Sequence, residues 1–241
     1  MHVRRPGPPL LAAGALVLAL ALAGRPALAE ADPLEGVNRR VHAFNDLARR
    51  WVLAPLAEAY RATTTPRIRH GIANAFANLN EPLTLASSLA AGETGLAWNA
   101  AARFGINTTL GLGGLRDRAL AMGYPRHPLT PGDALCHWGV PSGPFLVLPL
   151  LGPSTLRDAG ALAATSATLS QALGSDLFLA WSTGDALVGY DALHDALARI
   201  EAESLDPYAV YRSAFRQRRA ASCPADRAEA AAAEAEEPGL P

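Results

Sequence analysis

Residues 32–52 read DPLEGVNRRVHAFNDLARRWV, and this stretch introduces the pattern that recurs along the chain. It opens with the features of a helix start: Asp32 in the capping position, Pro33 in the first turn and Glu35 three residues after the cap. Apolar residues then return every three or four positions, namely Val37, Val41, Phe44, Ala48, Trp51 and Val52. This spacing places them on one face and predicts an amphipathic helix.

The same pattern predicts helices along most of the remaining chain. We expect Pro55 to end or kink the first helix, and a second helix to run from Thr65-Pro66 to a close at Pro82. Further helical segments are predicted at residues 84–89, 93–109 and 176–200 and after Asp206-Pro207. No stretch alternates apolar and polar residues with a period of two, so the sequence predicts an all-α fold without a sheet.

The middle of the chain is nearly free of charge. Between Ala134 and Ser175 the only charged residues are Arg157 and Asp158. The first part of this section is rich in large apolar residues, yet proline and glycine interrupt it every few positions, which argues against a transmembrane helix. Such a segment is typical of a loop or hairpin against lipid, or of one deep in a core, and composition leaves both interpretations open.

Composition and charge exclude several classes of protein. Of the 241 residues 50% are apolar, and 21 basic residues face 22 acidic ones, for a net charge of -1. This balance argues against a nucleic-acid-binding protein, which carries a basic excess. All the basic residues are arginines, and the lack of lysine excludes Walker-type phosphate loops and Schiff-base lysines. The basic run Arg216-Gln217-Arg218-Arg219 is expected on a solvated helix end.

Both ends of the chain are expected to lie outside the folded domain. Residues 1–29 have an arginine pair, an apolar run too short to span a bilayer and the small-residue cleavage pattern Ala27-Leu28-Ala29, as a signal peptide does. Residues 223–241 form an acidic Ala/Glu-rich tail that we expect to be disordered. A helical domain is therefore predicted at residues 30–222, in a protein exported to a bacterial envelope.

No group of residues has the spacing of a catalytic or metal site. Ser154 follows Gly152-Pro153 in a segment that lacks the second glycine of a nucleophile elbow, and we expect it to cap a helix near Leu156. None of the six histidines stands at metal-binding spacing from another histidine or a cysteine. Cys136 and Cys223 are the only cysteines, and they either pair or stay apart. The sequence predicts binding or transport, without catalysis, metal or cofactor.

Several short blocks follow one another in a characteristic order. They are DPLEGVNR (32–39), NLNEP (78–82), RFGINT (103–108), GLGGLRD (111–117), WGVPSGPF (138–145), LRD (156–158) and DPY (206–208). Together they resemble the MlaA/VacJ family of outer-membrane phospholipid transport components, over roughly residues 32–219. The residues carried by these motifs are Asp32, Pro33, Asn38, Phe44, Asn45, Glu81, Pro82, Arg103, Asn107, Gly113, Gly114, Asp117, Arg157, Asp158, Asp206, Pro207 and Tyr208.

The resemblance implies a ring of amphipathic helices around a central channel, with a Gly/Pro-rich apolar loop at that channel. Its loop and lipid-channel candidates are Gly139, Gly143, Pro144, Phe145, Leu146, Leu148 and Pro149. The implied function is removal of mislocalised phospholipid from the outer leaflet of the outer membrane, which maintains lipid asymmetry. The implied partners are phospholipids, an outer-membrane porin trimer and a periplasmic carrier of the MlaC type. The alternative is a soluble periplasmic lipid-binding or structural protein.

Anchoring is where the chain departs from this family, whose members are usually lipoproteins. Leu22-Ala23-Gly24 resembles a lipobox, but Arg25 stands where the lipidated cysteine is expected. We therefore expect an unlipidated protein on the periplasmic side of the outer membrane, held there by its apolar surface and its partners.

Overall fold

The computed structural model describes residues 32–228, which fold mostly into helices. In chain order the elements are α2 (Glu35–Ala48), the π-helix η2 (Arg49–Leu53), α3 (Ala54–Thr63), α4 (Pro66–Ala90), α5 (Thr94–Thr109), α6 (Arg118–Ala121), α7 (Pro131–His137), β1 (Phe145–Leu148), β2 (Gly152–Thr155), α8 (Leu156–Leu173), α9 (Ser175–Glu203) and α10 (Pro207–Ser222). The predicted helical class is confirmed. The predicted signal peptide lies outside the described residues.

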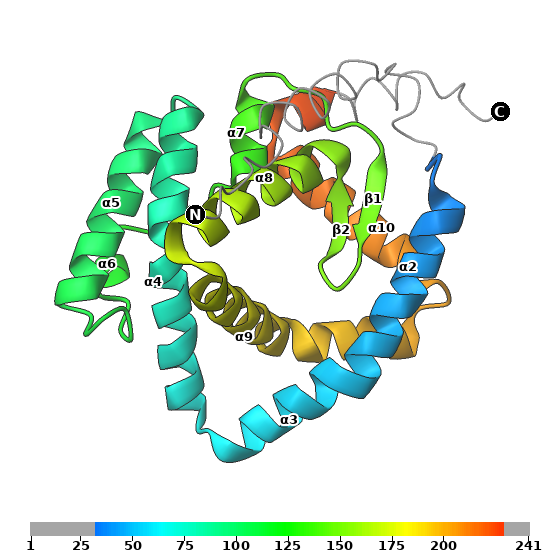
Figure 1. Cartoon of the computed structure of the whole chain (residues 1–241), viewed down its shortest axis with the longest axis horizontal. Helices are drawn as coiled ribbons and strands as arrows, with labels where there is room; N and C mark the ends of the chain where they lie inside the picture. The colour runs from blue at the N-terminus through cyan, green and yellow to red at the C-terminus, as the bar shows by residue number, and fades with distance from the viewer. Residues whose placement is uncertain (1–31, 229–241) are drawn as a thin grey trace, which may run out of the picture.

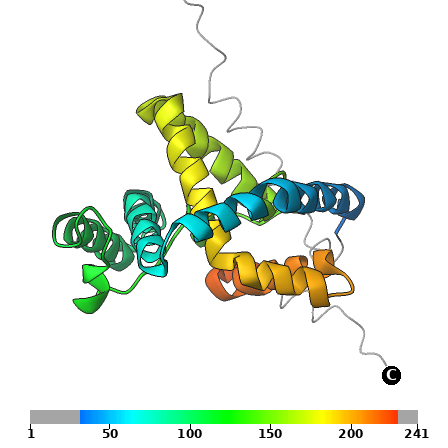
Figure 2. The same cartoon turned by 90° about the horizontal axis from the view of Figure 1, so that it is seen from below.

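The helices are arranged around the middle of the molecule rather than stacked in layers (Figure 1). The run from α2 through α3 to α4 forms two sides of an angular outline, and α5 packs along the outside of α4. The helix pair formed by α8 and the first part of α9 projects on one side of this outline (Figure 2). The last part of α9 and the whole of α10 lie on the other side. Within residues 32–228, no helix combines the length and the apolar character needed to cross a membrane.

Helix starts follow local sequence signals where a side chain can reach the first turn. The Thr65 hydroxyl accepts a hydrogen bond from the Ile68 amide, and the Asp206 carboxylate accepts one from the Ala209 amide, as predicted for α4 and α10. The predicted start of α2 is wrong by two residues, because the helix begins at Glu35 and its cap residue, Leu34, makes no side-chain bond. Asp32 accepts bonds from the Leu34 backbone amide, from the Asn38 side-chain amide and from Tyr208.

Neither Pro55 nor Pro82 ends a helix, although the sequence predicts an end at Pro82 and an end or a kink at Pro55. Pro82 lies inside α4, which continues to Ala90 because packing against α5 and α9 holds both of its halves. Pro55 lies in the first turn of α3, where a missing amide hydrogen costs little. The five-residue π-helix η2 joins α3 to α2, so the chain passes from one to the other without a break.

The charge-poor segment forms an antiparallel hairpin, so the expectation of no sheet is wrong there. Phe145 pairs with Thr155 and Leu148 with Gly152, and the three-residue turn places Leu150 at a φ of 64°. Each strand has only four residues, and β1 reads FLVL without a polar residue, because the hairpin is packed on both faces. A strand this short and uniformly apolar leaves no alternation for a sequence pattern to detect.

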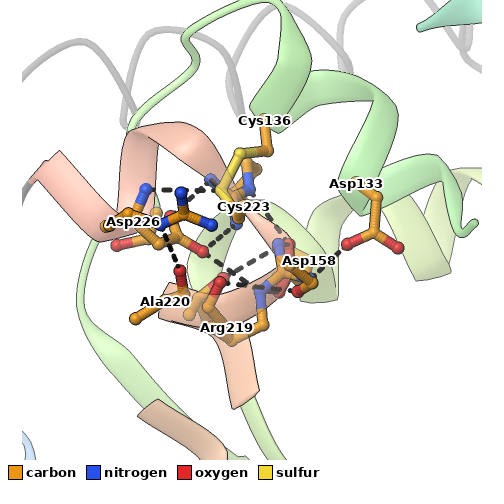
Figure 3. A network of polar contacts seen from close by, with 12 residues as sticks. Asp133, Cys136, Asp158, Arg219, Ala220, Cys223 and Asp226 are labelled. Atoms are coloured by element: carbon orange, nitrogen blue, oxygen red, sulfur yellow. Dashed lines mark hydrogen bonds and ion pairs between the residues drawn. A yellow bond between two sulfur atoms is a disulfide. The ribbon is translucent and has the colours of Figure 1, made fainter. Parts of the chain in front are cut away.

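A buried ion network joins the start of α8 to the residues that directly follow α10. The Arg157 side chain is wholly buried, and its two Nη atoms each donate to an oxygen of Asp226 at 2.9 Å. Cys136 and Cys223 form a disulfide beside it (Figure 3). The expectation of disorder after residue 222 is therefore wrong for residues 223–228, because Cys223 and Asp226 are buried; residues 229–241 lie outside the described residues.

Arg219 belongs to the same network, not to the solvated helix end that the sequence predicts. Its side chain is 10% exposed and donates to Asp226 at 3.1 Å and to Asp133 (Figure 3). Burial opposes ionisation of Asp133, yet bonds from Thr130 and the charge of Arg219 outweigh it and hold the pKa of Asp133 below its ordinary value. The network thus ties α7, α8 and α10 together through charged groups.

Replacing Arg157 with glutamine is expected to lower the free energy of unfolding by about 3–5 kcal/mol, because Asp226 then stays buried without its bidentate partner. Chemical denaturation followed by circular dichroism measures the change. Arg50→Gln is the control, since that side chain is 61% exposed and its pairing with Asp46 is worth less than about 1 kcal/mol. Equal losses in the two variants would contradict the structural role given to Arg157.

Candidate functional site

A large cavity of about 590 Å³ lies between α4, α8 and α9. Its walls carry many apolar side chains, among them Leu83, Leu162, Leu169 and Phe178. The charged groups on its lining are Glu81, Arg126 and Asp185, and Glu81 is already paired with the buried Arg103. The cavity is therefore mainly an apolar space, of the size that binds hydrophobic ligands.

A second, smaller cavity of about 250 Å³ lies between α2, the hairpin, α9 and α10. The hairpin contributes Phe145 and Val147 from β1 and Leu150 and Leu151 from the turn. Leu151 lines both cavities, so the tip of the hairpin stands at the boundary between them.

The second cavity differs from the first by a charged cluster formed by Asp46, Arg49 and Glu201. Their side chains are 13–20% exposed. Arg49 Nη2 lies 2.5 Å from an oxygen of Asp46 and 3.7 Å from an oxygen of Glu201. Both cavities are therefore mainly apolar, and the smaller one also carries a cluster of paired charges.

Aromatic side chains surround this charged cluster. Tyr211 donates to Glu201 at 3.0 Å, and its ring lies 5.4 Å from that of His42, centre to centre. Burial, together with the negative charge of Glu201, raises the pKa of Tyr211 above its ordinary value. The phenol therefore remains a neutral hydrogen-bond donor at physiological pH.

Two asparagines of α2 attach the hairpin to the helix. The Asn38 side chain donates to the Phe145 carbonyl at 3.0 Å and accepts from the Val147 amide at 2.9 Å. Asn45 donates to the Leu148 carbonyl at 2.9 Å and accepts from the Leu150 amide at 2.7 Å. They stand seven residues apart on one face of α2, and they satisfy the free backbone groups of β1 as a neighbouring strand would.

One of the predicted loop residues lines a cavity, and the others lie in the hairpin or in the segment that leads to it. Phe145 lines the second cavity, whereas Leu146, Leu148 and Pro149 are absent from the linings of both cavities. Gly139 and Gly143 adopt φ values of 75° and 69°, conformations that favour glycine, in the segment that leads from α7 to β1. The Pro144 carbonyl accepts a bond from the Leu156 amide at 3.1 Å, which fixes this segment against the start of α8.

The motif residues at the two ends of the domain meet in space. Tyr208 and Asn38 both donate to the carboxylate of Asp32, and Arg39 binds both oxygens of Asp206 at 2.8 and 3.1 Å. Pro33 and Pro207 lie at the turns that lead into α2 and α10. These residues join the first and last helices of the described chain.

A second group of motif residues joins α4 to α5 and the loop that follows. Arg103 donates to Glu81 at 2.6 Å and to Asp117 at 3.0 Å, and Asn107 donates to Asp117 at 3.1 Å. Burial opposes the ionisation of Asp117, but the bonds from Arg103 and the Leu120 amide outweigh it and keep the pKa of Asp117 low. In the segment at residues 111–114, a side chain on Gly114 would meet Asn78, so only glycine fits there; Gly113 also has a positive φ.

Most motif residues therefore connect elements of the fold through hydrogen bonds and ion pairs and do not line the cavities. Pro82, Arg157 and Asp158 belong to the joints described above, and Phe44 is 51% exposed on α2. Ser154 is buried in β2, and the cap of α8 is the neighbouring Thr155, so the predicted capping residue is wrong by one position. The sequence patterns did not reveal Leu151 and Glu201, although the apolar spacing of Leu193 and Leu197 predicts the helix that carries Glu201.

The fold and its cavities define a helical protein with two mainly apolar cavities, the smaller of which carries paired charges, an arrangement suited to an amphipathic ligand. The model of the family described as MlaA lipoprotein matches residues 30–222, and the chain belongs to this family. The resemblance seen in the sequence blocks is thereby confirmed.

Individual relatives and a solved structure support the same assignment. The intermembrane phospholipid transport system lipoprotein MlaA of Escherichia coli K12 is 32% identical over 216 residues, which cover 84% of this chain and 82% of the relative. An uncharacterized protein of Rickettsia felis is 32% identical over 198 residues, 79% of this chain and 77% of its own length. A solved structure described as the structural basis for maintenance of bacterial outer membrane lipid asymmetry superposes with a TM-score of 0.68 at 32% identity, covering 78% of this chain and 97% of its own.

Replacing Asn45 with leucine is expected to loosen the hairpin, because the Leu148 carbonyl and the Leu150 amide lose their partner. We expect amide hydrogen exchange at Leu150 to accelerate about tenfold, as the loss of about 1.4 kcal/mol implies. Asn99→Leu is the control, since it removes a bond to the Pro125 carbonyl and leaves the hairpin untouched. Unchanged exchange at Leu150 in Asn45→Leu would show that α2 does not hold the hairpin.

Proposed function

We propose that this protein removes mislocalised phospholipid from the outer leaflet of the outer membrane and passes it to a periplasmic carrier. The observation that carries the proposal is the pair of cavities that share Leu151. A phospholipid has two acyl chains and one polar headgroup, and these match the apolar larger cavity and the charged smaller one. The names of the relatives, which belong to an intermembrane phospholipid transport system, support the same substrate.

The proposed path leads along both cavities, past the tip of the hairpin. Its apolar walls come from α4, α8 and α9, and its polar wall comes from α2, α9 and α10. The arrangement of these helices around the middle of the molecule (Figure 1) supports the predicted ring with a central channel. Movement along such a path needs no covalent chemistry, in keeping with the expectation that the protein is not an enzyme.

The distribution of exposed apolar side chains supports a location in one leaflet of the outer membrane. Trp51, Trp98 and Trp138 are 76%, 68% and 75% exposed, and they come from η2, α5 and the end of α7. Amphipathic helices that lie in the plane of a leaflet bury such side chains among acyl chains without crossing the bilayer. The proposal includes a position on the periplasmic side of that membrane, beside a porin trimer and within reach of a carrier of the MlaC type.

A soluble periplasmic lipid-binding protein is the alternative, and the apolar lining of the larger cavity would serve it equally. Fractionation separates the two functions. Release of the whole protein by osmotic shock would favour the alternative, whereas retention with the outer membrane supports transport.

Replacing Leu151 with glutamate is expected to block transport, because a carboxylate at the boundary of the two cavities must be desolvated whenever an acyl chain passes. In a strain that depends on this protein, surface-exposed phospholipid should rise to the level of the deletion. Labelling of outer-leaflet phospholipid measures it.

Ser213→Glu is the matched control, since Ser213 is an exposed polar residue of α10 and lies outside both linings. The control is expected to transport as the parent does. Normal outer-leaflet lipid in Leu151→Glu, at equal protein abundance, would count against the path.

A further inference from the structure

The smaller cavity carries the charged cluster of Asp46, Arg49 and Glu201. The passage of acyl chains does not explain why charged residues stand there. Charges held away from water are costly unless they are paired, and an apolar wall at this place would accept hydrocarbon more readily. The cluster is nevertheless formed by side chains only 13–20% exposed, from helices that are far apart in the sequence. The cluster offers charges of both signs to a ligand in the smaller cavity.

We propose that the charged cluster binds the headgroup of a zwitterionic amine phospholipid, with the phosphodiester at Arg49 and the ammonium at Glu201. The inference rests on the proposed function and adds a preference among phospholipids to it. It assigns the smaller cavity as the headgroup site, next to the larger cavity for the acyl chains.

The geometry of the cluster gives each residue a separate part in this binding. A guanidinium is a planar donor that matches a phosphate oxygen pair. Arg49 is held tightly by Asp46 but lies 3.7 Å from Oε2 of Glu201, too far for a strong bond. Tyr211 donates to the other oxygen of Glu201, Oε1, at 3.0 Å. Glu201 Oε2 is thus the acceptor best placed for an incoming ammonium group.

The charge balance favours a zwitterion over an anion. Arg50 binds the second oxygen of Asp46 at 2.8 Å from the outer side, so the four charges of Asp46, Arg49, Arg50 and Glu201 sum to zero. A headgroup with one positive and one negative charge leaves this sum unchanged. An anionic headgroup adds an unbalanced negative charge beside two carboxylates, which is unfavourable in a partly dry site.

The aromatic neighbours add to the attraction for an ammonium group. Tyr190 and Tyr211 line the same cavity, and tyrosine rings attract cations through their faces. The ring of Tyr208 is already occupied, because the guanidinium of Arg39 lies 4.4 Å from its centre. The neutral Tyr211 phenol keeps its proton and continues to hold Glu201 in place.

The test measures which lipids the full chain retains. The membrane-extracted protein is equilibrated with vesicles that contain equal amounts of phosphatidylethanolamine and phosphatidylglycerol, re-isolated, and its bound lipids are quantified by mass spectrometry. We expect the parent protein to retain the ethanolamine lipid about threefold or more over the glycerol lipid, as one partly exposed ion pair would provide. Glu201→Gln, which keeps an acceptor for Tyr211, is expected to bring this ratio to about one.

Glu58→Gln is the matched control, because Glu58 is exposed on α3 and lies outside both cavities, and it should keep the ratio of the parent. Asp46→Asn is the second variant if Glu201→Gln fails to fold, and it should also lower the ratio. A parent protein without preference, or an unchanged ratio in the folded cluster variants, would overturn the headgroup site. A parent protein that retains no phospholipid at all would instead contradict the proposed function.

Discussion

The bidentate contact between Arg157 and Asp226 is the interaction that connects α8 to the segment after α10, and the arrangement of the helices depends on it. The guanidinium has no exposed surface, so its charge must be neutralised inside the protein. Its partners come from the start of α8 and from the segment after α10, and Arg219 extends the contact to α7 through Asp133. The disulfide between Cys136 and Cys223 fixes the same junction covalently. Three helices are thereby joined by charged groups and by a covalent bond.

In the rest of the molecule, too, polar groups are buried at the contacts between elements while large apolar groups stay exposed or line cavities. The largest side chains that are fully buried include Arg157 and Asn38, while many leucines and all four tryptophans remain exposed or line cavities. The polar joints, such as Arg103 with Glu81 and Asn45 with β1, hold the elements in position. A protein surrounded by water would gain most by burying its large apolar groups. In contact with acyl chains those groups need no burial, and buried polar joints then carry more of the structural specificity.

How far the sequence predicts this fold depends on how local each signal is. The starts of α4 and α10 were predictable, because Thr65 and Asp206 bond to amides three residues away. The passage of α4 through Pro82 was not, since packing on two neighbouring helices overrides the lost hydrogen bond.

The same limit applies to the candidate site. The sequence singled out Asn45, but its partners in β1 are more than one hundred residues away, and Asp226 is 69 residues from Arg157. The family resemblance supplied many of the joints. It did not supply Leu151 or Glu201, whose importance comes from where cavities form between helices.

The place of Asp226 in the chain has a consequence for biogenesis. A polypeptide emerges from its N-terminus, so α8 is complete long before the bidentate partner of Arg157 has been made. Until then Arg157 has Asp158 beside it but not Asp226, and the contact between α8 and the segment after α10 cannot form. The joint between Arg39 and Asp206 is delayed in the same way. Final folding is therefore confined to nearly full-length chains, and a prematurely terminated product keeps its junctions open and its apolar surfaces accessible to proteases of the envelope.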